Sequence, residues 1–341
     1  MRCLALLCIL ALAGWPGGAQ ADTTCTASAA PVNFGAVQNQ AGAATTTTMP
    51  IRISCSTTAL SLLAQARVRI CVGIGSGSAA PAILPTRLLA NASGDTLAYQ
   101  LFTDATYQVP YGLLPGGSPP ARDLQFTYNV PLIGGSGTLD AIVHARLPPN
   151  QNLAVGNYTS SFSMANVTLA YAYSEALLGA GAMPGSCTAT NTTGRKTATN
   201  SFPFTVNATV LPQCSGSVAT DMDFGEVTGR IAAPIDRTAV LSLTCVRRTV
   251  FNVSLDNGLY AQGTTRRMRH ATVPTAFIPY GLYRSAARDT RWGGTVGVDT
   301  VPGTGTGTRQ EITIHGRTPA TTGPLPAAGN YRDVITVTVT Y

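Results

Sequence analysis

The sequence is poor in charged and in aromatic side chains. Charged residues make up 11% of its 341 residues and aromatic residues 7%, and only one of the 22 basic residues is a lysine. Soluble helical proteins carry about a quarter charged residues, so this composition excludes a helical bundle and a coiled coil. It also excludes a chain kept disordered by its charge. With 35 Gly and 22 Pro, the sequence predicts a protein rich in strands and turns.

Long apolar runs are missing as well. The apolar stretch at residues 4–13 is too short for a membrane-spanning helix, which needs about 20 residues. With Arg2 before it and the small-x-small sequence Ala19-Gln20-Ala21 after it, this stretch predicts a cleaved secretory signal over residues 1–21. We expect no membrane span and an extracytoplasmic protein.

The rest of the sequence repeats itself. Cys25 is followed by VNFGAV (32–37) and Cys55, while Cys214 is followed by MDFGEV (222–227) and Cys245. Three later segments match in the same order: 99–102 with 280–283, 142–146 with 313–317, and 156–158 with 329–331. Short alternating segments between turn residues fill both copies. The sequence therefore predicts an all-β chain of two tandem immunoglobulin-like antiparallel β-sandwiches, residues 22–196 and 213–341.

Six cysteines remain after the predicted cleavage, and no Cys-x-x-Cys pair occurs among them. An even number in an exported chain favours disulfides over a zinc site. We expect two equivalent bridges, one in each copy, and a third between the two cysteines that have no counterpart. The expected pairs are Cys25–Cys55, Cys214–Cys245 and Cys71–Cys187.

Residues 202–210 (FPFTVNATV) have apolar side chains at every second position, as in a strand inserted into a core. No such segment precedes the first copy in the expected mature chain. If each copy lacks its last strand, residues 197–212 complete the first domain and leave the second incomplete. The side chains expected to fill the first domain are those of Phe202, Phe204, Val206, Ala208 and Val210. The alternating face that borders the unfilled groove is expected to carry Ile335, Val337, Val339 and Tyr341.

The repeated Cys…Phe-Gly-x-Val…Cys pattern, the late Gly-Asn-Tyr and the strand-like end at 333–341 resemble the spore coat protein U domain family. That family supplies subunits of archaic, Csu-type chaperone–usher pili. Ordinary subunits resemble one such domain preceded by a donor strand, whereas this chain has two domains and no such strand at its start. It therefore resembles the two-domain tip adhesin. Cys71, Cys187 and an irregular stretch at 172–196 depart from the family pattern.

The resemblance implies a set of partners and a location. A periplasmic pilus chaperone would lend a strand to the second domain, and the next pilin subunit would replace that strand with its own at the outer-membrane usher. The first domain would attach to an abiotic or host surface and support biofilm formation. The protein would be exported through the periplasm to the pilus tip at the cell surface of a Gram-negative bacterium.

Three apolar, Gly- and Pro-flanked stretches of the first copy are candidate adhesive loops: 80–85, 109–115 and 176–184. The alternative is that these loops fold back and cover the core. The candidate contact residues are Ile83, Leu84, Tyr111, Leu113, Leu114, Leu177, Leu178 and Met183.

We find no catalytic or metal-binding pattern and expect no enzyme activity and no cofactor. The basic run at 266–270 has no groove-reading or aromatic partners beside it, so we expect a solvated strand edge and no nucleic-acid site. Two other functions remain open. The chain could be a structural coat or pilus-shaft subunit, or a secreted carbohydrate-binding module, although Trp292 is the only tryptophan after residue 21.

Overall fold

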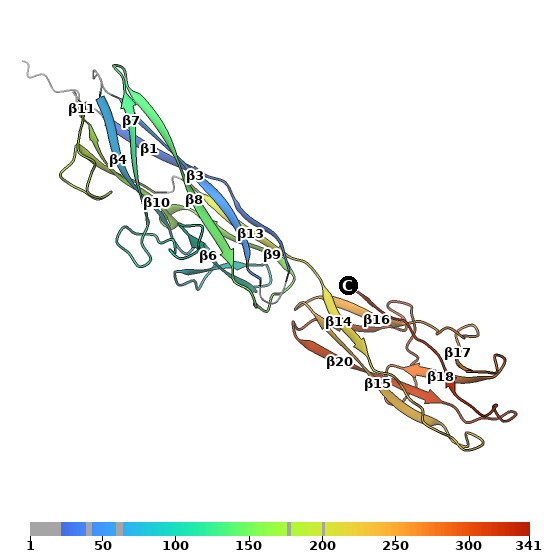
Figure 1. Ribbon diagram of the computed structural model, residues 1–341. Coiled ribbons are helices and arrows are strands. Elements are labelled where there is room, and N and C mark those ends of the chain that lie inside the picture. Colours follow the sequence, from blue (N-terminus) through green and yellow to red (C-terminus); the bar gives the residue numbers. More distant parts are fainter. Residues whose placement is uncertain (1–21, 39–42, 59–63, 176–178, 200–201) are drawn as a thin grey trace, which may run out of the picture.

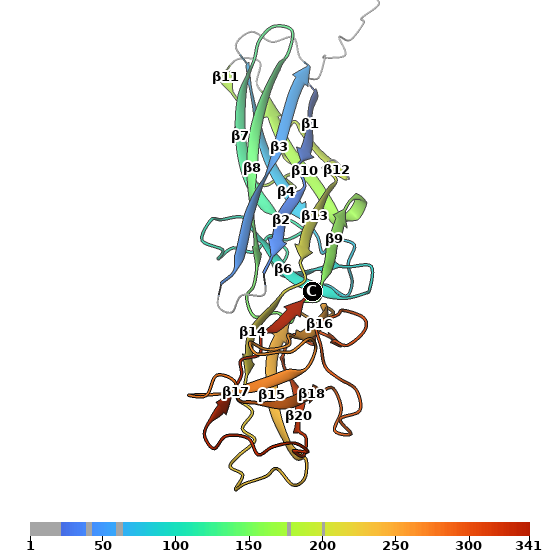
Figure 2. The ribbon, with the colours of Figure 1, turned by 90° about the vertical axis from the view of Figure 1, so that its right-hand side faces the viewer.

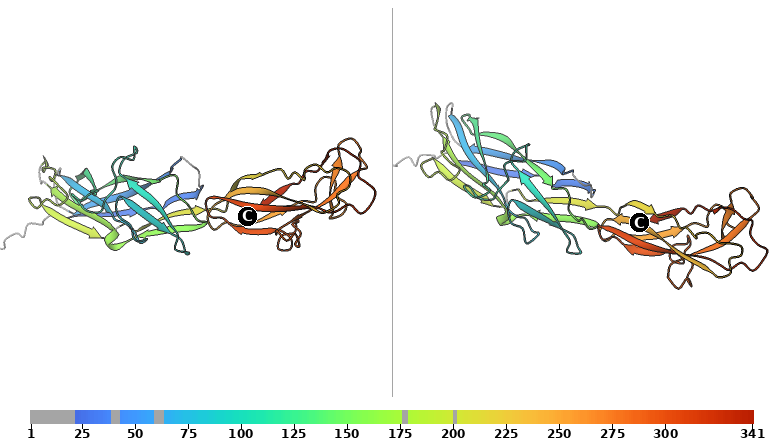
Figure 3. Two further views of the ribbon diagram at one scale, coloured as in Figure 1. Left: turned by 90° about the horizontal axis from the view of Figure 1, so that it is seen from below. Right: turned by 60° about the horizontal axis from the view of Figure 1, so that its bottom comes forward.

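A computed structural model describes residues 22–38, 43–58, 64–175, 179–199 and 202–341. Two elongated β-sandwich domains lie end to end (Figures 1 and 3). The regular structure in the described residues consists of strands and one turn of 3-10 helix, η1 (Met164–Asn166). The predicted signal, residues 1–21, lies outside the described part of the chain.

The first domain packs two sheets against each other. The order in the larger sheet is β1-β3-β8-β6-β5-β9-β13-β2, and the smaller sheet has the order β11-β4-β10-β12 with β7 also paired to β4. Inward side chains alternate with exposed ones, as in β3, where Met49, Ile51 and Ile53 are almost fully buried. The strands are β1 (Asp22–Ala29), β2 (Val32–Val37), β3 (Thr45–Thr58), β4 (Ala64–Ile74), β5 (Thr86–Ala90), β6 (Thr96–Phe102), β7 (Arg122–Val130), β8 (Gly135–Leu147), β9 (Gly156–Phe162), β10 (Val167–Glu175), β11 (Gly179–Ala180), β12 (Gly194–Thr199) and β13 (Phe204–Val210).

The second domain repeats this plan with shorter strands. Its sheets have the orders β14-β15-β20-β18-β17-β21 and β19-β16-β22. Trp292 is fully buried in its core, and the indole Nε1 donates a hydrogen bond to the carbonyl oxygen of Val253 over 2.9 Å. The strands are β14 (Cys214–Ala219), β15 (Ile235–Cys245), β16 (Val250–Leu255), β17 (Arg266–His270), β18 (Phe277–Tyr283), β19 (Val301–Thr304), β20 (Arg309–Thr318), β21 (Tyr331–Arg332) and β22 (Val337–Thr340).

Three disulfides hold the strands together. In each domain one bridge joins directly opposed residues of the first two long strands, β1–β3 and β14–β15. The third joins β4 to the loop that follows β11. The bonded pairs are Cys25–Cys55, Cys214–Cys245 and Cys71–Cys187.

Both domains contain a buried arginine opposite a buried tyrosine. Arg87 pairs with Tyr99, and Arg266 pairs with Tyr280. Each guanidinium donates hydrogen bonds to backbone carbonyls where a strand of the other sheet ends. Burial lowers the pKa of both arginines to about 10. The expectation that the run 266–270 is a solvated strand edge is therefore wrong, because β17 lies between β18 and β21 and both Arg266 and His270 are at most 5% exposed. The head of Arg266 is buried because it caps these carbonyls.

The junction between the domains is bridged by charge. Asp95, in the turn after β5, lies 2.8 Å from the guanidinium groups of both Arg247 and Arg248 of the second domain. Beside this contact, the backbone N–H of Val155 donates to the carbonyl oxygen of Arg247 over 2.9 Å. Burial alone would raise the pKa of Asp95, but a hydrogen bond from Asn91 and the two arginine charges outweigh it and lower that pKa. The junction thus rests on more than the short connector at 211–213.

Candidate functional site

In the first domain, a strand from the segment between the two copies fills the sheet. β13 lies between β9, to which it is antiparallel, and β2, to which it is parallel. β12 runs just before it and pairs antiparallel with β10. β12 and β13 together therefore pair with most of β10 and with the whole of β9, and Phe202 packs just before β13. Its inward side chains are at most 6% exposed: Phe202, Phe204, Val206, Ala208 and Val210.

The stretch 172–196, which was expected to be irregular, contains parts of two strands. The start of that stretch belongs to β10, and its end belongs to β12. β12 (GRKTAT) has no apolar alternation because it pairs at the outer edge of its sheet, where backbone hydrogen bonds suffice.

The matching place in the second domain has no strand. β21, the counterpart of β9, ends its sheet, and residues 222–227, the counterpart of β2, form no strand in the part of the chain that the structure describes. Phe224 nevertheless holds the position of Phe34. Its ring centroid lies 6.1 Å from that of Tyr280, and Phe34 lies 6.1 Å from Tyr99. The walls around this place are thus built alike in both domains.

Exposure differs between the two places. Val32, Phe34 and Val37 are at most 7% exposed beside β13. Their counterparts Met222 and Phe224 are half-buried, and Val227 is 43% exposed. The apolar side chains of the second domain therefore lie where a further strand would cover them.

The four residues expected to border an unfilled groove in the second domain lie in or next to its last strand, β22. β22 pairs with β16 and ends its sheet, whereas its counterpart β10 pairs on both sides with β4 and β12. Three of the expected side chains are half-buried against the second core, and the last is 55% exposed. They are Ile335, Val337, Val339 and Tyr341.

The end of the first domain that lies away from the second carries the turn between β7 and β8 (Figure 2). Leu132 is 53% exposed and Ile133 is 91% exposed on this turn. Gly134 closes it with a φ of +112°, which a larger residue rarely adopts. Two large apolar side chains are therefore presented at the distal end.

A buried hydrogen-bond network holds the strand ends beneath this turn. The hydroxyls of Thr23, Thr57 and Tyr128 are joined by contacts of 2.6 Å, and Thr23 also donates to Glu175. Burial raises the pKa of Glu175. Because these residues come from four strands, β1, β3, β7 and β10, the network fixes the base of the distal end.

The first two candidate adhesive loops lie elsewhere. Residues 80–85 and 109–115 lie on the flank of the first domain, in the half nearer the second domain (Figures 1 and 2). Ile83 is 83% exposed and Leu114 is 60% exposed, but Leu84 and Leu113 are half-buried.

Tyr111 is fully buried, so its assignment as a surface contact is wrong. Its N–H donates to Leu101 and its carbonyl oxygen accepts from Arg87, which turns the side chain into the core. In the third loop Met183 is half-buried, while Leu177 and Leu178 lie outside the described residues.

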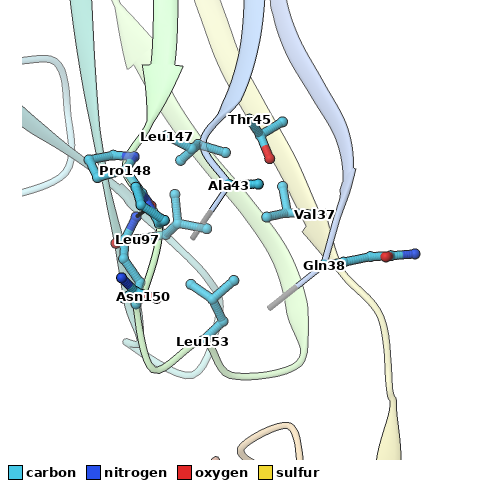
Figure 4. A pocket seen from close by; sticks show the side chains of 11 residues that line it. Val37, Gln38, Ala43, Thr45, Leu97, Leu147, Pro148, Asn150 and Leu153 are labelled. Carbon is cyan, nitrogen blue, oxygen red and sulfur yellow. Dashed lines mark hydrogen bonds between the residues drawn. The ribbon is translucent and has the colours of Figure 1, made fainter. Parts of the chain in front are cut away.

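Neither of two cavities in the first domain is a ready ligand site. One, beside Leu97, Leu147 and Leu153, has a volume of about 20 Å³, enough for one water molecule (Figure 4). The other is an open cleft of about 690 Å³ beside the Cys71–Cys187 bridge. No aromatic side chain is among the described residues that line this cleft, so it lacks a platform on which a sugar could stack.

Two segments of the chain, 16–165 and 200–338, match the model of the Spore Coat Protein U domain. The chain belongs to this family. The second segment includes β13, although β13 is packed in the first domain. In sequence the strand thus belongs to the second copy of the Spore Coat Protein U domain, and in space to the first.

The chain is also similar to solved structures. One is the Acinetobacter baumannii CsuC-CsuE chaperone-tip adhesion subunit pre-assembly complex of archaic chaperone-usher Csu pili, with 20% identity, a TM-score of 0.47 and coverage of 93% of this chain and 100% of that one. Another is the CupB6 tip adhesin of Pseudomonas aeruginosa, with 13% identity, a TM-score of 0.33 and coverage of 93% and 94%. No curated protein matches the chain. Among the described residues, no helix has the length and apolar character needed to cross a membrane.

Proposed function

We propose that this Spore Coat Protein U domain protein is the tip adhesin of an archaic chaperone–usher pilus. The first domain attaches to surfaces and supports biofilm formation. The second domain is incomplete and accepts a strand, first from a periplasmic chaperone and then, at the outer-membrane usher, from the next pilin subunit. It is a structural and adhesive protein, not an enzyme, and it acts at the cell surface.

The difference between the two copies carries this proposal. β13 fills the place between β9 and β2, while the corresponding place between β21 and residues 222–227 has no strand in the described chain. A half-exposed apolar wall beside free strand edges recruits another polypeptide strand. The first domain thus supplies a template for how the second would be completed.

The first strand of the first domain supports a position at the tip. Asp22 pairs with Thr58 in the β1–β3 ladder, and the inward side chains of β1 are buried. This strand is thus part of the first domain's own sheet, and we do not expect it to be donated to another subunit.

The distal turn is the best candidate for adhesion. Leu132 and Ile133 face solvent at the end opposite the strand-accepting domain. Burying both against an apolar surface would contribute about 3–6 kcal/mol per molecule. Many fibres acting together would multiply that contribution.

The test replaces Leu132 and Ile133 together by serine in a piliated strain. We expect attachment to plastic to be lost while the number and length of fibres, counted by electron microscopy, stay unchanged. Leu114→Ser on the flank is the matched control, because Leu114 is also an exposed leucine. Attachment retained by the distal variant and lost by the flank variant would move the adhesive site to the flank loops.

The same experiment separates the other functions. A coat or shaft subunit predicts short or missing fibres when the gene is deleted, whereas a tip adhesin predicts fibres that no longer attach. A carbohydrate-binding module predicts that soluble sugars compete with attachment. Neither of the two cavities described above has an aromatic side chain among the described residues that line it, so neither supports that function.

A further inference from the structure

Asp333 occupies a position in the second domain that serine holds in the first. Gly77 and Gly258 both have a positive φ, and a side chain there would collide with Ser160 in the first case and Asp333 in the second. Counting from the repeated Gly-Asn-Tyr gives the same equivalence, because Ser160 and Asp333 both stand two residues after its tyrosine. The two copies therefore differ by a carboxylate at one matched site.

In the first domain, this site lies on β9, the strand that is directly paired with β13. Ser160 of β9 is opposite Val206 of β13 in the antiparallel ladder. Both residues are 0% exposed, so both side chains point into the core. Asp333 directly follows β21, so a strand that fills the second domain and extends this ladder would place the side chain at its Val206 position opposite Asp333.

The carboxylate of Asp333 is held by neutral donors. It accepts a hydrogen bond from the Tyr280 hydroxyl over 2.8 Å and another from the Leu259 backbone N–H over 2.9 Å. No basic side chain of the described residues forms an ion pair with it. Burial and this carboxylate together raise the pKa of Tyr280. Asp333 is half-buried, and an added strand would bury it further.

We propose that Asp333 selects the incoming strand by charge, admitting an uncharged side chain opposite it and rejecting Asp or Glu. This inference rests on the strand-accepting role proposed above. Like charges on directly opposed residues of neighbouring strands repel each other, and the repulsion grows as water is removed. The partner is thus a polypeptide strand with alternating apolar residues and no acidic residue at this position.

A peptide copy of residues 201–212 is a suitable probe, because it carries the pattern that fills the first domain. Three versions carry Val, Asn or Asp at position 206. Each is labelled and titrated against the full mature chain, and binding is followed by fluorescence anisotropy. Trp292 fluorescence reports the unfolding of the second domain in parallel, because this residue lies in its core.

We expect the Asp peptide to bind about tenfold or more weakly than the Asn peptide, which has the same shape without the charge, because two like charges so close in a partly buried place repel strongly. The variants Asp333→Ser, which copies the first domain, and Asp333→Asn should reduce this difference to the smaller one that comes from burying the peptide's own carboxylate. Unchanged Trp292 melting curves without peptide show that both variants fold.

Equal affinities of the Asp and Asn peptides for the unmodified protein would overturn the inference. So would an Asp penalty that is equally large in both Asp333 variants and in the unmodified protein. Failure of all three peptides to bind would instead reject the strand-accepting role on which the inference rests.

Discussion

Replacing Phe204 by alanine should destabilise the first domain more than any other single alanine substitution in β13. The Phe204 ring is 6% exposed and stacks on Phe162, with ring centroids 4.5 Å apart and planes 2° from parallel. Truncating a buried phenylalanine costs about 3–5 kcal/mol. In a domain of this size, each kcal/mol lowers the melting temperature by about 2–4 °C, so we expect a fall of about 6–20 °C.

The assay compares two optical signals of the full mature chain. Near-ultraviolet circular dichroism follows the tyrosines of both domains, whereas Trp292 fluorescence follows the second domain alone. In the Phe204→Ala variant, only the unfolding transition of the first domain, called the first transition below, should shift to lower temperature. Leu211→Ala, just beyond the end of β13 and 54% exposed, is the control and should shift stability by no more than about 0.5 kcal/mol.

A small shift would refute this reasoning. If Phe204→Ala lowers the first transition no more than Leu211→Ala does, β13 is not part of the first core. If Phe204→Ala instead lowers the Trp292 transition, the strand belongs with the second domain, next to which it lies in sequence.

Two further predictions concern buried charge. Arg87→Lys should lower the unfolding free energy by about 2–4 kcal/mol, because an ammonium group cannot reach the carbonyls of Ile74, Gly75 and Tyr111 together. Denaturant unfolding measures this loss, with the exposed Arg52→Lys as the control. Equal stabilities of the two variants would contradict the prediction. Asp95→Asn should weaken the association of the two domains by about 1–2 kcal/mol, because it removes the charge that pairs with both arginines. The effect is modest because both arginines are partly exposed. The pKa of Asp95 is lowered in the folded protein, so its contribution is complete above the ordinary value near 3.9 and is lost as pH falls through the lowered one. The measurement is the distribution of distances between one spin label on each domain. It should broaden below the lowered pKa of Asp95 in the unmodified protein, and already at neutral pH in the Asp95→Asn variant. A distribution that stays narrow in both cases would disprove the role of Asp95.

Local pattern was enough to predict the sandwiches. The alternation at 202–210 appears in the structure as the buried face of β13, because a strand between two others must bury every second side chain. The repeated cysteine spacing likewise corresponds to directly opposed residues of β1–β3 and β14–β15. Both features arise between neighbouring residues or neighbouring strands.

Exposure could not be predicted in the same way. The stretch 109–115 is apolar throughout, yet Tyr111 is buried and Leu114 is exposed, because Arg87 and Leu101 hold the backbone at Tyr111. Leu132 and Ile133 were missed because two residues make too short a stretch to stand out. A usable signal was present: a four-residue Pro-Leu-Ile-Gly turn between two strands must project its middle side chains.

Contacts between distant residues left no local signal. Asp95 meets arginines more than 150 residues away, and nothing around it in the sequence indicates them. The sequence alone did not indicate that Asp333 and Ser160 occupy equivalent places; the structure shows it, because each lies against a matching glycine. A repeat thus predicts which residues are equivalent, but not what an exchange between them does.

The two copies differ in how their sheets are completed in the described residues. β12 and β13 come from the segment between the copies and pair with β10 and with β9 and β2, so each sheet of the first domain includes a strand from this segment. The second domain ends at β22 with one side of that strand unpaired in the described chain. The turn after β17, which corresponds to the turn that carries Asp95, holds no acidic residue. If another subunit follows the second domain, as proposed above, this turn would supply no carboxylate for a second charged junction, and we expect attachment to depend on the strand that fills the second domain.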